Sequence, residues 1–212
     1  MDTLETQREA FVGADVVFCT LGTTRTAAGS AANYRRIDVD YVDKAAAAAK
    51  AAGVPHFSLL TAQGAKKDVW HSEHKLFHGC APVRPPVCCT CWRDGTQLSC
   101  LFWCASLSLY YMHLKGCAEE AVTQRAFRAT SIFRPGMLDR GAAARDGLER
   151  VACAVLPNTH VSALARAMIS VAERTASGVV PPSPTPAVYE TPDIKNVAAA
   201  AAVKMLKEHS PR

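Results

Sequence analysis

Short apolar runs rich in β-forming residues alternate with helical segments along this chain, and this alternation limits the possible folds more than any other feature. The first run, DVVFCTL at 15–21, stops at Gly22, which is typical of a strand buried on both faces. Strands that alternate with helices predict an α/β fold with a parallel sheet. The expected strands are 15–21, 54–60, 130–133 and 188–189, and the expected helices are 34–52, 110–127, 161–172 and 193–207.

The composition is that of one folded domain. The chain has 212 residues, of which 49% are hydrophobic, so 1–212 is interpreted as a single domain with its own core. The net charge of +5 comes from scattered Lys and Arg, which predicts no nucleic-acid partner. The polar N-terminal segment shows no secretory signal, and this favours a cytoplasmic location.

The candidate site lies just after the predicted strands, because open parallel sheets bind ligands beyond the carboxyl ends of their strands. Tyr111 and Lys115 are four residues apart, so on a helix they share one face. A nearby ammonium lowers the pKa of a phenol, which is ordinarily near 10, so such a pair suits proton transfer to a carbonyl oxygen. A Tyr-x-x-x-Lys also arises by chance. Its position between strands that end at Thr61 and at Arg134 favours a catalytic interpretation.

Four strings occur in order along the chain: GADVVFCTLGTTR, YRRIDVDYVDKAAAAAKAAGVPHFSLLTAQGA, LYYMHLKG and FRPGMLDR. Together they resemble the Tat-interacting-protein oxidoreductase family, an atypical branch of the short-chain dehydrogenases. The resemblance covers 1–78 and 109–170. It implies a doubly wound, Rossmann-like sheet, NADP(H) as cofactor, and hydride transfer to or from a carbonyl or alcohol substrate of unknown identity. Because relatives occur at mitochondria and in the nucleus, the mitochondrial outer surface and the nucleus are alternative locations.

The resemblance also implies roles for individual residues. Tyr111 corresponds to the proton donor, and Lys115 to the lysine that hydrogen-bonds the nicotinamide ribose. Thr61 corresponds to the hydroxyl that positions the substrate, although this chain has Thr-Ala where the family has Ser-Ser. For 21–25 an ordinary strand-to-helix turn is the alternative to cofactor binding. The implied cofactor contacts are Leu21, Gly22, Thr23, Arg25, Tyr111, Lys115, Leu138 and Arg145.

The glycine-rich turn that cradles the cofactor pyrophosphate in such folds is missing from this sequence. None of its twelve glycines forms a G-x-G or G-x-x-G. Residues 1–15 resemble the family's segment before the fourth strand, so we expect the first βαβαβ half to be absent. In the doubly wound order the first strand neighbours the fourth. The run from Val16 to Leu21 is therefore expected to be an exposed edge through which the chain could pair with a protein partner.

Residues 79–108 interrupt the family pattern and hold six of the nine cysteines. We expect an irregular insertion, which translated intron sequence in an imperfect gene model would explain. A zinc module from Cys88, Cys91, Cys100 and Cys104 is disfavoured because their spacing is not that of a standard ribbon, so no metal site is predicted. A membrane span over 95–114 is disfavoured by its polar residues.

Three functional interpretations follow from these features. The first is an NADP(H)-dependent oxidoreductase, which the Tyr111, Lys115 and Thr61 set favours. The second is an inactive remnant that serves as a protein-interaction module, which the missing glycine turn favours. The third is a fragment from an imperfect gene model.

Overall fold

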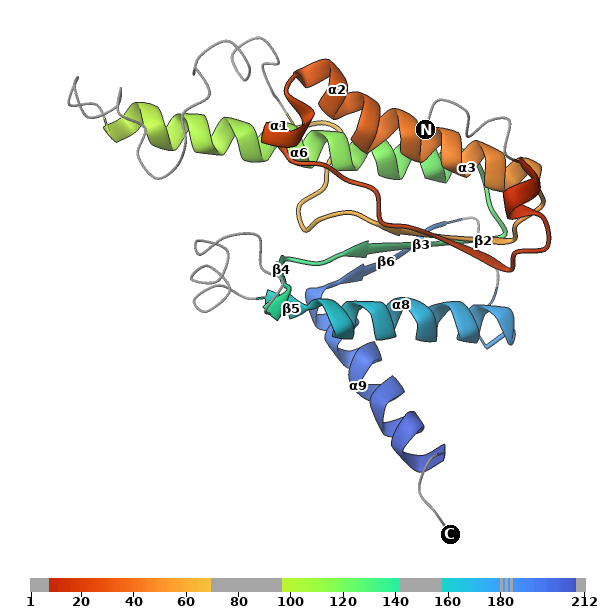
Figure 1. Ribbon diagram of the computed structural model, residues 1–212. Coiled ribbons are helices and arrows are strands. Elements are labelled where there is room, and N and C mark those ends of the chain that lie inside the picture. Colours follow the sequence, from red (N-terminus) through yellow and green to blue (C-terminus); the bar gives the residue numbers. More distant parts are fainter. Residues whose placement is uncertain are drawn as a thin grey trace.

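Four parallel strands form the central sheet, in the order β1-β2-β3-β6 (Figure 1). They are β1 (Val16–Cys19), β2 (His56–Leu60), β3 (Ala129–Arg134) and β6 (Ala187–Glu190). The α/β fold with a parallel, Rossmann-like sheet is thus confirmed. The computed structural model describes residues 8–69, 97–141, 158–179, 181, 183 and 185–208, and for 97–108 the backbone path alone.

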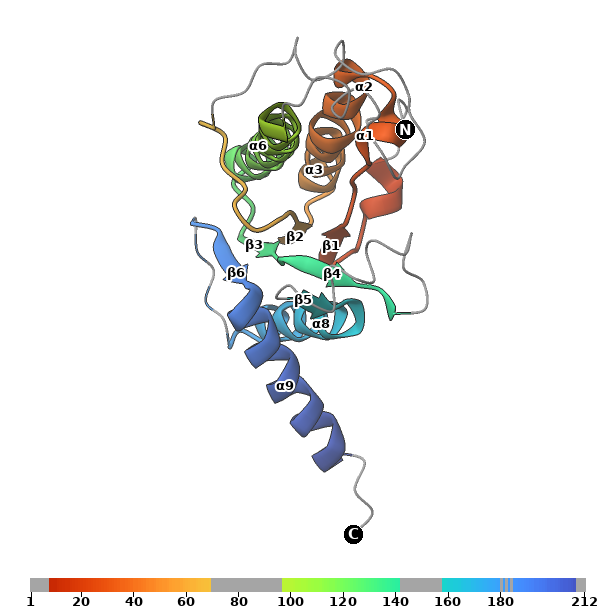
Figure 2. The same ribbon diagram turned by 90° about the vertical axis from the view of Figure 1, so that its left-hand side faces the viewer.

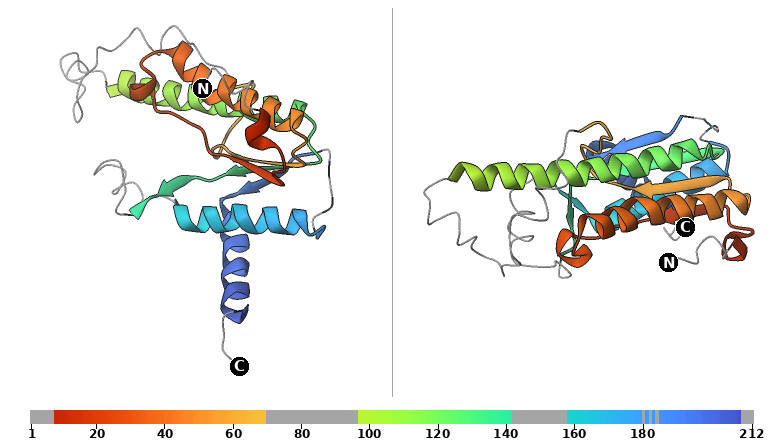
Figure 3. Two further views of the ribbon diagram at one scale, coloured as in Figure 1. Left: turned by 45° about the vertical axis from the view of Figure 1, so that its right-hand side comes forward. Right: turned by 90° about the horizontal axis from the view of Figure 1, so that it is seen from above.

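Helices cover both faces of the sheet (Figure 2). One face carries the layer that contains α3 and α6, and the other carries α8, with α9 running outward from it (Figures 1 and 3). Two short strands, β4 (Met137–Asp139) and β5 (Asn158–His160), pair in parallel beside α8. The helices are η2 (Arg8–Phe11), α1 (Arg25–Ala28), α2 (Ala31–Arg35), the π-helical turn η3 (Arg36–Asp40), α3 (Tyr41–Ala51), α6 (Gln97–Gln124), α8 (Val161–Ala176) and α9 (Thr191–Glu208).

The alternation of side chains along each strand builds two apolar cores. Phe57 and Leu59 point to the α3 and α6 side, where they pack with Val42 and Val122. The small alanines of α3 let this helix lie close to the sheet. Phe133 points to the other side and packs with residues of α8 and α9. Both helical layers are therefore fixed to the sheet, which holds the carboxyl ends of the strands in place.

The cysteine-rich insertion is partly regular, contrary to expectation. Helix α6 begins at Gln97, so 97–108 form its first turns rather than an irregular segment. These residues run directly into the predicted helix that carries Tyr111. Extending an existing helix is easier than starting one, so the helix continues although the composition changes. Residues 79–96, with Cys88 and Cys91, lie outside the described residues.

Neither a membrane span nor a metal cluster occurs in the described ranges. No helix there is long and apolar enough to cross a membrane. No group of three or more His, Cys, Asp or Glu side chains in those ranges could hold a metal ion.

Gly116 allows α6 to cross the segment after β2 at very close range. A Cβ atom at this position would lie 2.3 Å from the backbone nitrogen of Lys67. Alanine favours a helix over glycine by about 1 kcal/mol, so Gly116→Ala would stabilise the chain if there were room. We expect it instead to lower the free energy of unfolding by about 1–3 kcal/mol, because rigid backbone must move. The free energies of unfolding of the parent chain and the variant are measured by urea unfolding.

The control for Gly116→Ala is Gly53→Ala. Gly53 has a positive φ of 84°, and a Cβ atom added there would meet no other atom within 4 Å, so this variant reports backbone strain alone. That strain costs about 1–2 kcal/mol. A neutral or stabilising Gly116→Ala would contradict the close contact between α6 and the backbone at Lys67.

His56 is a buried imidazole on the α8 side of the sheet. Its Nε2 lies 2.9 Å from Ser131 Oγ, and burial lowers the pKa of His56 below its ordinary value. Because the unfolded chain binds a proton at higher pH than the folded chain, stability falls as the pH drops below about 6.5 and levels off below the folded-state pKa.

Replacing His56 tests this pH dependence. In His56→Gln the loss of stability between pH 7 and 5 should be smaller, by up to about 1.4 kcal/mol per pH unit in the affected range. The exposed His160, which caps α8, gives the control His160→Asn, since Asn also caps helices. Urea unfolding at each pH is the measurement, and an unchanged slope in His56→Gln would count against a neutral buried imidazole.

Candidate functional site

A buried ion pair lies at the carboxyl end of β1. Lys115 reaches from α6 under the loop that follows β1, and its Nζ lies 2.6 Å from Asp38 Oδ1. The same Nζ donates a hydrogen bond to the carbonyl oxygen of Leu21 at 3.2 Å. The Lys115 and Asp38 side chains are 6% and 0% exposed. A buried charge needs such a partner, so each residue fixes the other.

Asp38 belongs to the π-helical turn η3, between α2 and α3. A π turn holds an additional residue and is frequent at functional sites. The second carboxylate oxygen, Oδ2, accepts a hydrogen bond from the backbone N–H of Thr23 at 3.0 Å. Asp38 thus joins three elements: its own turn, the loop after β1, and α6.

Gly22 makes the close contact between this loop and Lys115 possible. A Cβ at Gly22 would lie 3.0 Å from Lys115 Nζ and 3.5 Å from Asp38 Oδ1. A larger residue would have to displace the ion pair. The loop sequence Leu21-Gly22-Thr23 therefore supplies a carbonyl, a space and an N–H, in that order, around the two charges.

Tyr111 lies one helical turn before Lys115, and the Lys115 Nζ is 5.7 Å from the centre of its ring. The neighbouring Tyr110 has a different role: it is buried, packs edge-on against Tyr34, and donates from its hydroxyl to the Ala31 carbonyl at 3.4 Å. Burial and the nearby Asp38 carboxylate raise the pKa of Tyr34. Tyr111 is half-buried, so it is more exposed than Tyr110, and it is the tyrosine whose ring lies near the Lys115 ammonium.

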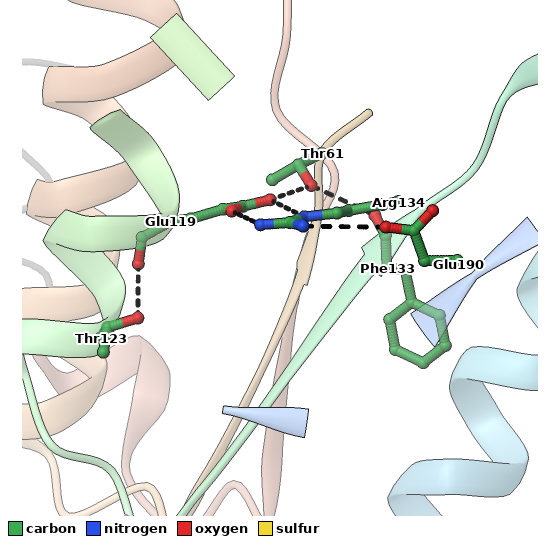
Figure 4. A network of polar contacts seen from close by, with 6 residues as sticks. All are labelled: Thr61, Glu119, Thr123, Phe133, Arg134 and Glu190. Carbon is green, nitrogen blue, oxygen red and sulfur yellow. Dashed lines mark hydrogen bonds and ion pairs between the residues drawn. The ribbon is translucent and has the colours of Figure 1, made fainter. Parts of the chain in front are cut away.

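Thr61 belongs to a second polar network, at the carboxyl ends of β2 and β3 (Figure 4). Its Oγ1 donates to Glu119 Oε1 at 2.6 Å, and Glu119 also accepts two hydrogen bonds from Arg134, at 2.9 and 2.5 Å. The Glu119 carboxylate holds the pKa of Arg134 above its usual range. The single hydroxyl hydrogen of Thr61 is directed to Glu119, so it would have to turn to donate to a substrate carbonyl.

Comparison with known proteins identifies relatives of this chain. A family model described as NAD(P)H-binding matches residues 1–80. HTATIP2 from Rattus norvegicus is 33% identical over 185 residues, which make up 85% of this chain and 60% of the rat protein. The chain is a relative of HTATIP2, and its first 80 residues match an NAD(P)H-binding family. It spans three-fifths of the length of this relative.

Solved structures with the same fold contain nicotinamide cofactors. The Bacillus anthracis dTDP-4-dehydrorhamnose reductase in complex with NADP is 11% identical, with a TM-score of 0.53 over 95% of this chain and 67% of that chain. The Bordetella bronchiseptica enzyme WbmG in complex with NAD is 12% identical, with a TM-score of 0.52 over 99% and 62%. At these identities the likeness concerns the fold alone. Support for a nicotinamide cofactor comes from the NAD(P)H-binding family model over residues 1–80.

The structure brings together only part of the set of residues that the HTATIP2 family resemblance implies. Leu21, Gly22, Thr23 and Tyr111 lie around the buried charge pair that Lys115 forms with Asp38. Two other residues of the set lie apart from this pair: Arg25 begins α1, and Leu138 lies in β4 and packs against the core that contains Phe133. Arg145 lies outside the described residues.

Sequence reasoning missed Asp38 and Glu119. Both carry a periodic signal: Asp38 lies four residues from the buried Tyr34 and Val42, and Glu119 lies four residues after Lys115. An acidic residue on the apolar face of a helix indicates a buried partner. The sequence showed this spacing, but it could not show which cation would meet each carboxylate.

Proposed function

We propose that this chain is an NADP(H)-dependent oxidoreductase that transfers hydride between the nicotinamide and a carbonyl or alcohol substrate. The observation that carries the proposal is the buried Asp38–Lys115 pair under the loop after β1, with Tyr111 one turn away on the same helix. The preference for NADP(H) rests on the family resemblance.

The residues on the nicotinamide side fit such a cofactor. The Lys115 ammonium has three N–H donors: one is donated to the Leu21 carbonyl, and a second faces its ion-pair partner Asp38. The third could hold a ribose hydroxyl. When bound, the cofactor supplies or accepts the hydride. The pyrophosphate side is not provided by a glycine turn in this sequence.

In carbonyl reduction, the hydroxyl of Tyr111 would donate its proton to the substrate oxygen. The phenolate that remains carries a negative charge, which the nearby Lys115 ammonium stabilises. Asp38 keeps Lys115 in position and balances its charge. In the direction of alcohol oxidation the same phenolate accepts the proton from the alcohol.

Titration of the purified chain with NADPH, followed by cofactor fluorescence, tests the proposal. We expect a saturable change that NADH gives only at higher concentration. In the double variant Asp38→Asn/Lys115→Met no buried charge is left alone, yet the ribose contact is lost. Its Kd should rise by about 10- to 100-fold, since a hydrogen bond from a charged group contributes about 1.5–3 kcal/mol. No saturable change at millimolar NADPH would refute the proposal.

A further inference from the structure

The sheet is open at β1. Within the described ranges β1 pairs with β2 only, and it lies at the edge of the sheet (Figure 2). Val17 and Cys19 pack against the α3 layer, whereas Phe18 faces the α8 side and is 43% exposed. An edge strand with an exposed aromatic side chain is a site for pairing with another strand.

A groove of about 410 Å³ adjoins this edge on the α8 side. It runs between the amino ends of β1, β2 and β3 and the second half of α8. Its walls are largely apolar, and charged groups at Asp15, Arg128 and Glu173 border it. Because the Asp38–Lys115 site lies at the carboxyl end of the sheet, this groove is not the nicotinamide site. We name the edge and groove the β1 dock, defined by Val16, Phe18, Ile169, Ala172 and Ala176.

We propose that the β1 dock binds a strand–helix unit, with the strand parallel to β1 and an amphipathic helix in the groove beside α8. Every strand pair in the central sheet is parallel, so a parallel strand continues its pattern. A strand added at this edge is buried on both faces only if a helix also covers the α8 side. The groove provides the place for that helix.

The comparisons indicate which strand–helix unit fits. The WbmG structure aligns with 99% of this chain, but this chain covers only 62% of it. In doubly wound sheets the unit with the glycine-rich turn supplies the strand on this side of the sheet. The occupant is therefore a strand–helix unit that carries such a turn. The inference rests on the fold and the groove, and it holds whether or not the proposed hydride transfer does.

A binding experiment with separate polypeptides tests the β1 dock. The probe is the part of rat HTATIP2 outside the 60% that matches this chain, fused to maltose-binding protein and titrated against the full chain by biolayer interferometry without nucleotide. We expect a saturable one-to-one complex. Phe18→Asp and Ile169→Asp should each raise the Kd by at least about tenfold, since burial of a large apolar side chain contributes about 1.5–3 kcal/mol.

The matched control is Val188→Asp on β6, the other edge strand of the described sheet. Val188 is 42% exposed, close to the value for Phe18, so the two variants place the same charge on opposite edges. Val188→Asp should leave the Kd within about twofold. Circular dichroism and cooperative unfolding establish that each variant is folded.

Three results would overturn the β1 dock. The first is the absence of a complex between the probe and the folded chain. The second is an equal loss of binding in Val188→Asp. The third is self-association of the chain that Phe18→Asp abolishes, because a second copy would then occupy the edge. Since nucleotide is absent throughout, none of these results depends on cofactor binding.

Discussion

Asp38→Ala is expected to lower the free energy of unfolding by about 3–5 kcal/mol, because it leaves the buried ammonium of Lys115 without its partner. The same change removes the acceptor for the Thr23 N–H, so the loop after β1 loses its attachment to the helix. Urea unfolding followed by circular dichroism measures the difference. The effect should be large because neither charge can reach water without local unfolding.

The control for Asp38→Ala is a solvent-exposed ion pair of the same kind. Asp43 and Arg125 approach to 2.6 Å, but their side chains are 37% and 38% exposed. Asp43→Ala should cost no more than about 1 kcal/mol. The double variant Asp38→Asn/Lys115→Met should recover much of the stability that Asp38→Ala loses. Similar losses in Asp38→Ala and Asp43→Ala would contradict the burial of the Asp38–Lys115 pair.

Tyr111→Phe is expected to reduce turnover by about 10²- to 10⁴-fold, the usual contribution of a positioned general acid. Stability should change little, because the ring remains and the hydroxyl belongs to a half-buried side chain. The NADPH Kd should also stay close to that of the parent chain. Turnover is measured as NADPH oxidation with a panel of aliphatic and aromatic aldehydes and ketones, using the best substrate found.

The adjacent Tyr110 provides the control for Tyr111→Phe. Tyr110→Phe removes a hydroxyl from the same helix but on its buried side, where it hydrogen-bonds Ala31. We expect it to lower stability by about 0.5–1.5 kcal/mol and to leave turnover within a few-fold. If Tyr111→Phe kept full turnover, Tyr111 would not be the proton donor.

The sheet could be predicted from the sequence because its strands are short, apolar and bounded by turn residues. Each of the four central strands lies within two residues of its predicted limits. The helix over 110–127 was found from its pattern, but its beginning at Gln97 was not. The segment before it has a different composition, and only the backbone hydrogen bonds of the helix show its continuation.

The site was less predictable because charges far apart in the sequence build it. Lys115 was identified from its spacing to Tyr111. Its partner Asp38 lies in a π turn, which the sequence pattern did not predict. Thr61 was identified by resemblance, yet its hydroxyl contacts Glu119, whose orientation depends on Arg134 at the end of β3. Such contacts depend on how the sheet brings the ends of its strands together.

The π turn at Arg36–Asp40 also sets the rotational phase of the helical rod from Ala31 to Ala51. Because one residue of an α-helix corresponds to about 100° of rotation, removing one residue from this turn would convert it to regular helix and rotate one half of the rod against the other. Tyr34 and Val42 then could not both keep their buried contacts. In this part of the chain a one-residue deletion should be more damaging than most substitutions, because it rotates Asp38 and its neighbours relative to the rest of the site.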